Sequence, residues 1–140
     1  MRIASRTPLL ATTVLVVALA ACTGTQTTAL TTTPKNPAAQ GEVETRRTAN
    51  KNTEVNIEVE YMAPPQAVAN NATTYVVWTK PLTEDLPPQN VGALVVGKDR
   101  KASLKTVTPY ERFDLLVTPE PSGTVASPTN EPVMKAKISR

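Results

Sequence analysis

Few side chains in this 140-residue sequence have the types and spacing that chemistry requires. Glu84 and Asp85 are adjacent in a polar stretch, and paired carboxylates can serve acid–base catalysis or bind calcium. Adjacent side chains do not converge on one ligand, however, so two carboxylates alone are too few for a metal site. Ser103 and Lys105 would share one face of a strand, as a Ser–Lys dyad needs, although a solvated polar face has the same spacing.

Glu120 is the remaining candidate for a binding residue. It lies between Pro119 and Pro121, which predicts a rigid exposed loop whose carboxylate either contacts a partner or only aids solubility. The sequence has no His, and its single Cys, Cys22, is too few for an intrachain disulfide or a Cys-based zinc site. We therefore expect no enzymatic activity, no metal and no cofactor.

Residues 1–21 have the composition of an export signal. Arg2 and Arg6 precede an apolar run from Leu9 to Ala21, which is shorter than the about 20 residues of a transmembrane helix. The run ends in Leu19-Ala20-Ala21-Cys22, which resembles the lipobox of bacterial lipoproteins. The resemblance implies that Cys22 is lipidated and becomes the new N-terminus, so that the membrane is one partner. An ordinary secretory signal that places Cys22 near its cleavage site by chance is the alternative.

The predicted location is the bacterial cell envelope. Thr23 rather than Asp follows the cysteine, and resemblance to lipoprotein sorting signals then implies the outer membrane in a Gram-negative cell. Removal of residues 1–21 lowers the 15 basic side chains to 13, against 12 acidic ones. The remaining Lys and Arg form no basic stripe along the sequence, so nucleic acid is not an expected partner.

Residues 22–51 are predicted to be the lipidated cysteine followed by a disordered, Thr-rich tether. The stretch from Thr23 to Asn50 has no apolar period of 2 or 3.6 residues, so it buries too little surface to offset the entropy of ordering. As a flexible coil it would reach about 30 Å. An edge strand or a helical turn over residues 41–48 is the alternative.

Residues 52–140 are predicted to form an all-β domain. Apolar and polar residues alternate from Val55 to Glu60, whereas the run over 73–79 is apolar on both faces, as in a central strand. Further strands are expected over 91–96, 102–108, 112–118 and 133–138, separated by Pro and Gly turns. This pattern predicts an antiparallel immunoglobulin-like sandwich of six or seven strands, preceded by the signal peptide and the disordered linker.

Charged and aromatic residues of this domain lead to two further expectations. The glutamates of the strand over 54–60 could pair with Lys135 and Lys137, which predicts that the first and last strands lie side by side. Two independently solvated faces are the alternative. The one tryptophan, Trp78, lies inside an apolar strand, so we expect it in the core rather than stacked on a glycan.

Four short motifs occur along this domain, in the order Tyr75-Val-Val-Trp78, Val91-Gly92-Ala-Leu94, Phe113-Asp-Leu-Leu-Val-Thr-Pro-Glu120-Pro and Ser127-Pro128-Thr129. Their spacing resembles the extracytoplasmic C-terminal domain of anti-sigma-K factors. The resemblance covers residues 73–140 and implies a sandwich in an exported location. The sigma-binding domain and transmembrane helix of that family are not seen in this sequence, so inhibition of a sigma factor is not expected.

These features together predict a lipid-anchored, non-catalytic cell-envelope protein. Its β-sandwich would have a structural or protein-binding role, with an envelope protein as partner, and the candidate binding residues are Glu84, Asp85 and Glu120. The alternative function is a ligand-sensing or glycan-binding envelope module related to anti-sigma factor ectodomains.

Overall fold

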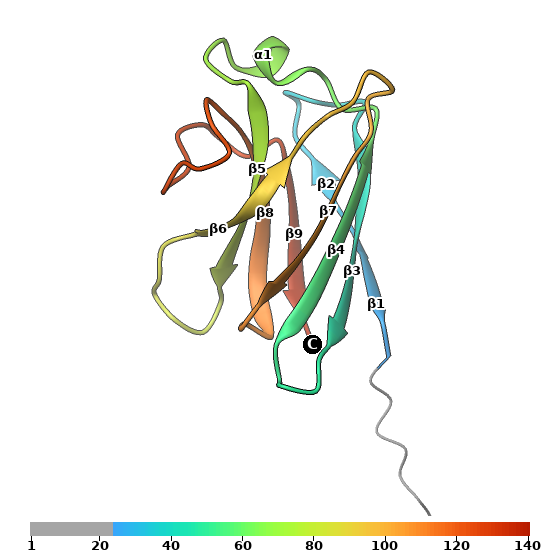
Figure 1. Ribbon diagram of the computed structural model, residues 1–140, viewed down its shortest axis with the longest axis vertical. Coiled ribbons are helices and arrows are strands. Elements are labelled where there is room, and N and C mark those ends of the chain that lie inside the picture. The colour runs from blue at the N-terminus through green and yellow to red at the C-terminus, as the bar shows by residue number, and fades with distance from the viewer. Residues whose placement is uncertain (1–23) are drawn as a thin grey trace, which may run out of the picture.

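Alternation of side chains along the strands builds the fold. In the strand that begins at Thr53, the residues Thr53, Val55, Ile57 and Val59 are buried, while the glutamates between them reach the surface. The computed structural model describes residues 24–140, so the predicted signal over 1–21 and Cys22 lie outside the described residues. Within 24–140, two antiparallel sheets pack face to face around one apolar core (Figure 1).

Nine strands and one short helix make up the described residues. They are β1 (Gln26–Ala29), β2 (Thr31–Thr32), β3 (Gln40–Arg47), β4 (Thr53–Glu60), α1 (Pro65–Val68), β5 (Thr74–Pro81), β6 (Gln89–Leu94), β7 (Ala102–Thr108), β8 (Arg112–Glu120) and β9 (Met134–Ser139). One sheet has the order β1-β3-β4-β7, and the other has the order β2-β9-β8-β5-β6. The predicted all-β antiparallel sandwich is confirmed, and β5 is a central strand as expected.

Strands β1, β2 and β3 lie within residues 22–51, where a disordered tether was predicted, and the structure corrects that prediction. Val43 and Thr45 of β3 are buried, and so is Leu30 between β1 and β2. The Thr-rich sequence lacks a strong apolar period of its own, and burial comes instead from pairing with β4 and β9, which are distant in sequence. These additional strands raise the number above the six or seven expected.

The predicted pairing of the first and last strands is wrong. Residues 54–60 form β4 between β3 and β7, whereas β9 lies in the opposite sheet between β2 and β8. The order β3-β4-β7 in one sheet and β5-β8-β9 in the other matches the A-B-E and C-F-G orders of immunoglobulin constant domains, whereas β6 pairs with β5 instead of joining the first sheet beside β7 as strand D does. The glutamates of β4 consequently meet other cations than Lys135 and Lys137.

The two long sides of the sandwich are built differently. On one side the run Gln26–Thr32 crosses between sheets, since β1 pairs with β3 and β2 pairs with β9. On the other side β6 meets β7, where the Thr106 hydroxyl donates to the Val91 carbonyl at 2.9 Å. Gly92 has a φ of +145° there, and a Cβ on it would lie 2.9 Å from a Leu104 methyl group. Glycine therefore permits this close approach.

Aromatic side chains fill both faces of β5. Tyr75 packs in the core between the sheets, together with Phe113 from β8. Trp78 points to the opposite face of β5 and is nevertheless fully buried, as expected for a core residue. The segment over 121–133 is held across this outer face, because the Asn90 side-chain amide donates to the carbonyls of Gly123 and Val125.

Candidate binding surfaces

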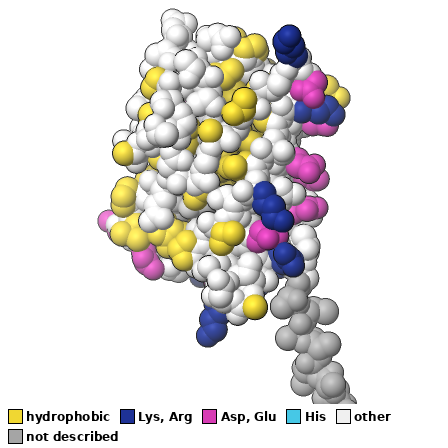
Figure 2. All heavy atoms as spheres, viewed as in Figure 1, with side chains coloured by type: hydrophobic (Ala, Val, Ile, Leu, Met, Phe, Trp, Pro, Cys, Tyr) yellow, Lys and Arg dark blue, Asp and Glu magenta, His cyan; other side chains and the backbone are white. Residues whose placement is uncertain are grey.

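The outward side chains of the four-stranded sheet form an acidic face. Five glutamates and two cations occupy outward positions on its strands: Glu42, Glu44, Glu54, Glu58, Glu60, Arg46 and Lys105. Figure 2 shows charged side chains in a column along the right-hand side, where Figure 1 places this sheet. The strands alternate strictly, so every charge that faces outward stands opposite another outward residue.

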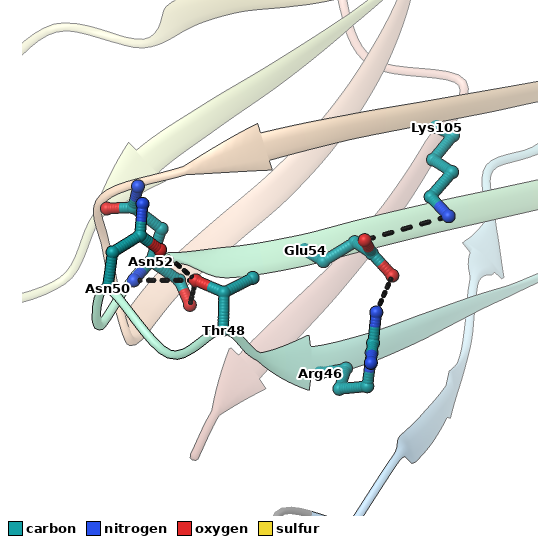
Figure 3. A network of polar contacts seen from close by, with 6 residues as sticks. All are labelled: Arg46, Thr48, Asn50, Asn52, Glu54 and Lys105. Carbon is teal, nitrogen blue, oxygen red and sulfur yellow. Dashed lines mark hydrogen bonds and ion pairs between the residues drawn. The ribbon is translucent and has the colours of Figure 1, made fainter.

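Some of these charges are paired across strands. Arg46 donates to the Glu54 carboxylate at 3.1 Å, and the Lys105 ammonium lies 3.6 Å from the same carboxylate (Figure 3). The hydrogen bond from Arg46 lowers the pKa of Glu54, and the nearby charges of Arg46 and Lys105 add to this effect. This carboxylate is thereby shared between β3 and β7, the two neighbours of β4.

A second ion pair lies at the other end of the acidic face. The Lys101 ammonium is 2.5 Å from the Glu60 carboxylate, and this hydrogen bond raises the pKa of Lys101. Within residues 24–140, by contrast, no ion pair involves Glu42, Glu44 or Glu58. Glu42 and Glu58 are directly opposite each other in the β3–β4 register, where like charges destabilise a sheet.

A groove of about 940 Å³ runs along this face. Residues from β1, β3, β4 and β7 line it, and Glu42, Glu58 and Glu60 are among them. Glu60 is paired with Lys101, which also lines the groove, whereas the unpaired carboxylates of Glu42 and Glu58 favour a partner with basic side chains. The groove is open to solvent, and Ser103 of β7 also lines it, directly opposite Glu58 in the β4–β7 register.

Glu120 does not occupy the exposed loop that its flanking prolines predict. It is the last residue of β8 and is fully buried beneath the segment over 121–133. The Trp78 Nε1–H donates to the Thr118 hydroxyl at 2.8 Å, and that hydroxyl donates to the Glu120 carboxylate at 2.6 Å. The backbone N–H of Thr129 donates to the same carboxylate at 2.9 Å, and its hydroxyl also contacts it. Glu120 therefore fastens the segment over Trp78 and is not a surface for partners.

Glu84 and Asp85 are exposed in the connection between β5 and β6. They follow Pro81 at one end of β5, whereas Glu120 pairs with Thr74 at the other end, so the structure does not bring the three candidates together. No group of three or more potential metal ligands occurs in the part of the chain that the structure describes. Nothing in the geometry assigns Glu84 or Asp85 a binding role.

Ser103 and Lys105, the residues with the spacing of a Ser–Lys dyad, lie on the acidic face. Ser103 and Lys105 both point outward from β7, as the alternation predicts, but the Lys105 ammonium lies against Glu54. The Lys105 ammonium is therefore engaged by a carboxylate of β4 rather than by the Ser103 hydroxyl. The solvated polar face, which was the alternative interpretation, describes these two residues.

Glu42 and Glu44 are the binding candidates that sequence reasoning missed. The segment Gln40-Gly-Glu-Val-Glu-Thr-Arg47 does alternate, with Val43 and Thr45 as its buried positions. That period of two is the signal that identifies a strand here, and the outward glutamates follow from it.

No helix in residues 24–140 is both long and apolar enough to cross a membrane. No known protein family, curated protein or solved structure matches this chain.

Proposed function

We propose that this protein is a lipid-anchored, non-catalytic component of the cell envelope that binds a partner protein through its acidic face. The lipobox-like sequence that ends at Cys22 supports the anchor. The observation that best supports binding is the groove lined by Glu42 and Glu58, two directly opposed carboxylates without a cation of their own chain. A basic segment of a partner protein would relieve that repulsion.

The face of the four-stranded sheet suits this role better than the sheet edges. Its groove is continuous over four strands, whereas β6 and β7 contact each other and the first strand crosses between the sheets. The alternative function, recognition of a glycan, calls for an exposed aromatic platform. Trp78, the only tryptophan, is fully buried and does not offer one.

The anchor is tested by intact mass and membrane fractionation. We expect the natively expressed protein to gain the mass of acyl chains on a chain that begins at Cys22, and to sediment with membranes. The Cys22→Ala variant should leave the membrane fraction. If both proteins are soluble and unacylated, the anchor is excluded, and the protein acts as a secreted or periplasmic domain.

The binding surface is tested by photo-crosslinking in cells. A crosslinking residue at Ser103, which lines the groove beside Glu58, should form an adduct with one envelope protein. The same residue at Thr124, which is exposed outside the groove, is the control. Combining the Ser103 probe with Glu42→Gln and Glu58→Gln should abolish the adduct. An adduct that survives both substitutions would contradict recognition by these carboxylates.

A further inference from the structure

The outward side chains of the five-stranded sheet include a group of cations. Lys80 of β5, Arg112 of β8, and Lys135 and Lys137 of β9 all point away from the core, and all four are exposed. They occupy three adjacent strands, because β8 pairs with β5 on one side and with β9 on the other. We call these four residues the basic patch.

Little negative charge opposes the basic patch. Asp114 is the one partly exposed acidic residue on its strands, and it stands between Lys80 and Lys137 in the sheet register. Glu120 also points to this side, but it is buried beneath the segment over 121–133. Within residues 24–140, no ion pair involves any of the four cations. On the strands themselves, four cations against one partly exposed carboxylate leave the surface positively charged, while Glu84 and Asp85 lie exposed in the connection that follows β5.

The basic patch lies toward the end of the sandwich at which the described chain begins. Gly24 accepts a hydrogen bond from the side chain of Arg140, which directly follows β9. Arg112 begins β8 and Lys80 is the next-to-last residue of β5, so both lie at this same end (Figure 1). Only three residues separate Cys22 from Gln26, the first residue of β1, and four peptide steps span at most about 14 Å.

We propose that the basic patch binds the anionic headgroups of the membrane that holds the lipid anchor. This inference rests on the proposed anchor at Cys22, because the short connection then keeps the domain close to the bilayer. Each Lys or Arg near an anionic membrane surface strengthens binding about fivefold, and the attraction fades within a Debye length of about 8 Å. Docking of the five-stranded sheet on the lipid leaves the acidic face on the opposite sheet free for a partner protein.

The test measures vesicle flotation with the full chain carrying Cys22→Ser, so that acylation contributes nothing to binding. The vesicles contain phosphatidylcholine alone or an equal mixture of phosphatidylcholine and phosphatidylglycerol. We expect the anionic vesicles to bind at least tenfold more protein at low salt than the neutral ones. Replacing all four residues of the basic patch by Gln should lower binding to the anionic vesicles severalfold. The leader, with Arg2 and Arg6, is the same in every variant, so the effect of the basic patch is measured by comparing variants on the same vesicles.

A matched control removes the same amount of charge elsewhere. Lys35 lies in the connection between β2 and β3, and Lys98, Arg100 and Lys101 lie in the connection between β6 and β7. Both connections are at the end of the sandwich opposite to Arg112, and replacement of the four residues by Gln also changes the net charge by four. This control should retain the preference for anionic vesicles. Circular dichroism confirms that each variant is folded, and Lys137→Glu alone, which should weaken binding severalfold, replaces any quadruple variant that fails to fold.

Three outcomes would overturn the proposal. They are equal binding to both vesicle types, an unchanged preference in the patch variant, or an equal loss in the matched control, which would indicate net charge alone. Salt-sensitive self-association that is lost on replacing either the basic patch or Glu42 and Glu58 would assign the patch to a second copy of the chain instead. Since the chain used has no lipidated residue, the result is independent of whether wild-type Cys22 is acylated.

Discussion

At the scale of single residues, position in the fold decides what a charge can do. Glu120 and Glu58 are both outward-pointing residues on strands, yet one is covered by a chain segment and the other lines an open groove. The buried carboxylate has donors on several sides and stabilises a local arrangement. The exposed one faces Glu42 and stabilises nothing within its own sheet.

Loss of the buried carboxylate should loosen the segment over Trp78. In the variant Glu120→Ala, the Thr118 hydroxyl and the Thr129 N–H lose their acceptor, which should lower the free energy of unfolding by about 3 kcal/mol. Glu120→Gln keeps one acceptor oxygen and should cost about 1 kcal/mol. Urea unfolding followed by Trp78 fluorescence measures both. Glu131→Ala, at an exposed site, is the control, and an unchanged midpoint for Glu120→Ala would contradict the network.

The phenol of Tyr75 should make stability fall at alkaline pH. Burial raises the pKa of Tyr75 from 10.0 to about 12, and its hydroxyl donates to the Ala63 carbonyl at 2.8 Å. Because the folded state holds this proton more tightly, the stabilisation is complete below pH 10 and is lost as the pH rises toward 12. The variant Tyr75→Phe should therefore show a shallower decline of unfolding free energy between these pH values than wild type. Tyr61→Phe, at a residue 53% exposed, is the matched control, and an equal slope in Tyr75→Phe and wild type would disprove the assignment.

At the scale of elements, the N-terminal strands show how pairing creates order in a sequence with little local preference. Strand β3 has only Val43 and Thr45 as fully buried residues, and β1 has none. Both nevertheless extend the sheet, because β4 presents a long, strongly alternating strand as a partner. A weak alternation becomes a strand when a complementary edge is available.

A substitution in β3 distinguishes a strand from a tether. Val43→Ala removes two methyl groups from a fully buried site and should lower the free energy of unfolding by about 2 kcal/mol. Glu44→Ala, at the next and outward-facing position, should change it by less than about 0.5 kcal/mol. Chemical denaturation measures the difference. If neither substitution changes stability, β3 does not pack against the core and the predicted tether would be reinstated.

At the scale of the whole molecule, the two sheets present opposite charges to their surroundings. The acidic face lies on the four-stranded sheet and the basic patch on the five-stranded one, so the modest net charge of the chain conceals a strong asymmetry. The described chain begins beside the C-terminal residue, at the end of the sandwich toward which the basic patch lies. A protein anchored at that end can meet lipid with one sheet and a partner with the other.

Energy transfer from Trp78 to a dansyl-labelled lipid tests the closeness of the domain to the membrane. The single tryptophan makes the donor unambiguous. In the acylated protein we expect efficient transfer, which should fall when a 20-residue Gly/Ser spacer, of about 25 Å root-mean-square length, is inserted after Thr25. The same spacer inserted after Lys98, in an exposed turn, should leave the transfer unchanged. Equal transfer with and without the spacer at Thr25 would contradict a short, close connection.

The sequence by itself determined the fold class and the identity of much of the core. Alternation from Thr53 to Glu60 and the apolar run around Trp78 are local signals, and each predicts a strand because side chains alternate across a β-strand. The proline and glycine turns between such runs excluded long helices. These features depend on neighbours in the sequence, which a single sequence displays directly.

Only the tertiary structure decided which residues meet. Glu54 is paired by Arg46 and Lys105 rather than by the last strand, and Glu120 is covered although it stands between two prolines. The acidic face depends on β3 beside β4, and the basic patch depends on β9 beside β8. Pairing between distant strands depends on the combined burial of the whole core, so local spacing does not specify it.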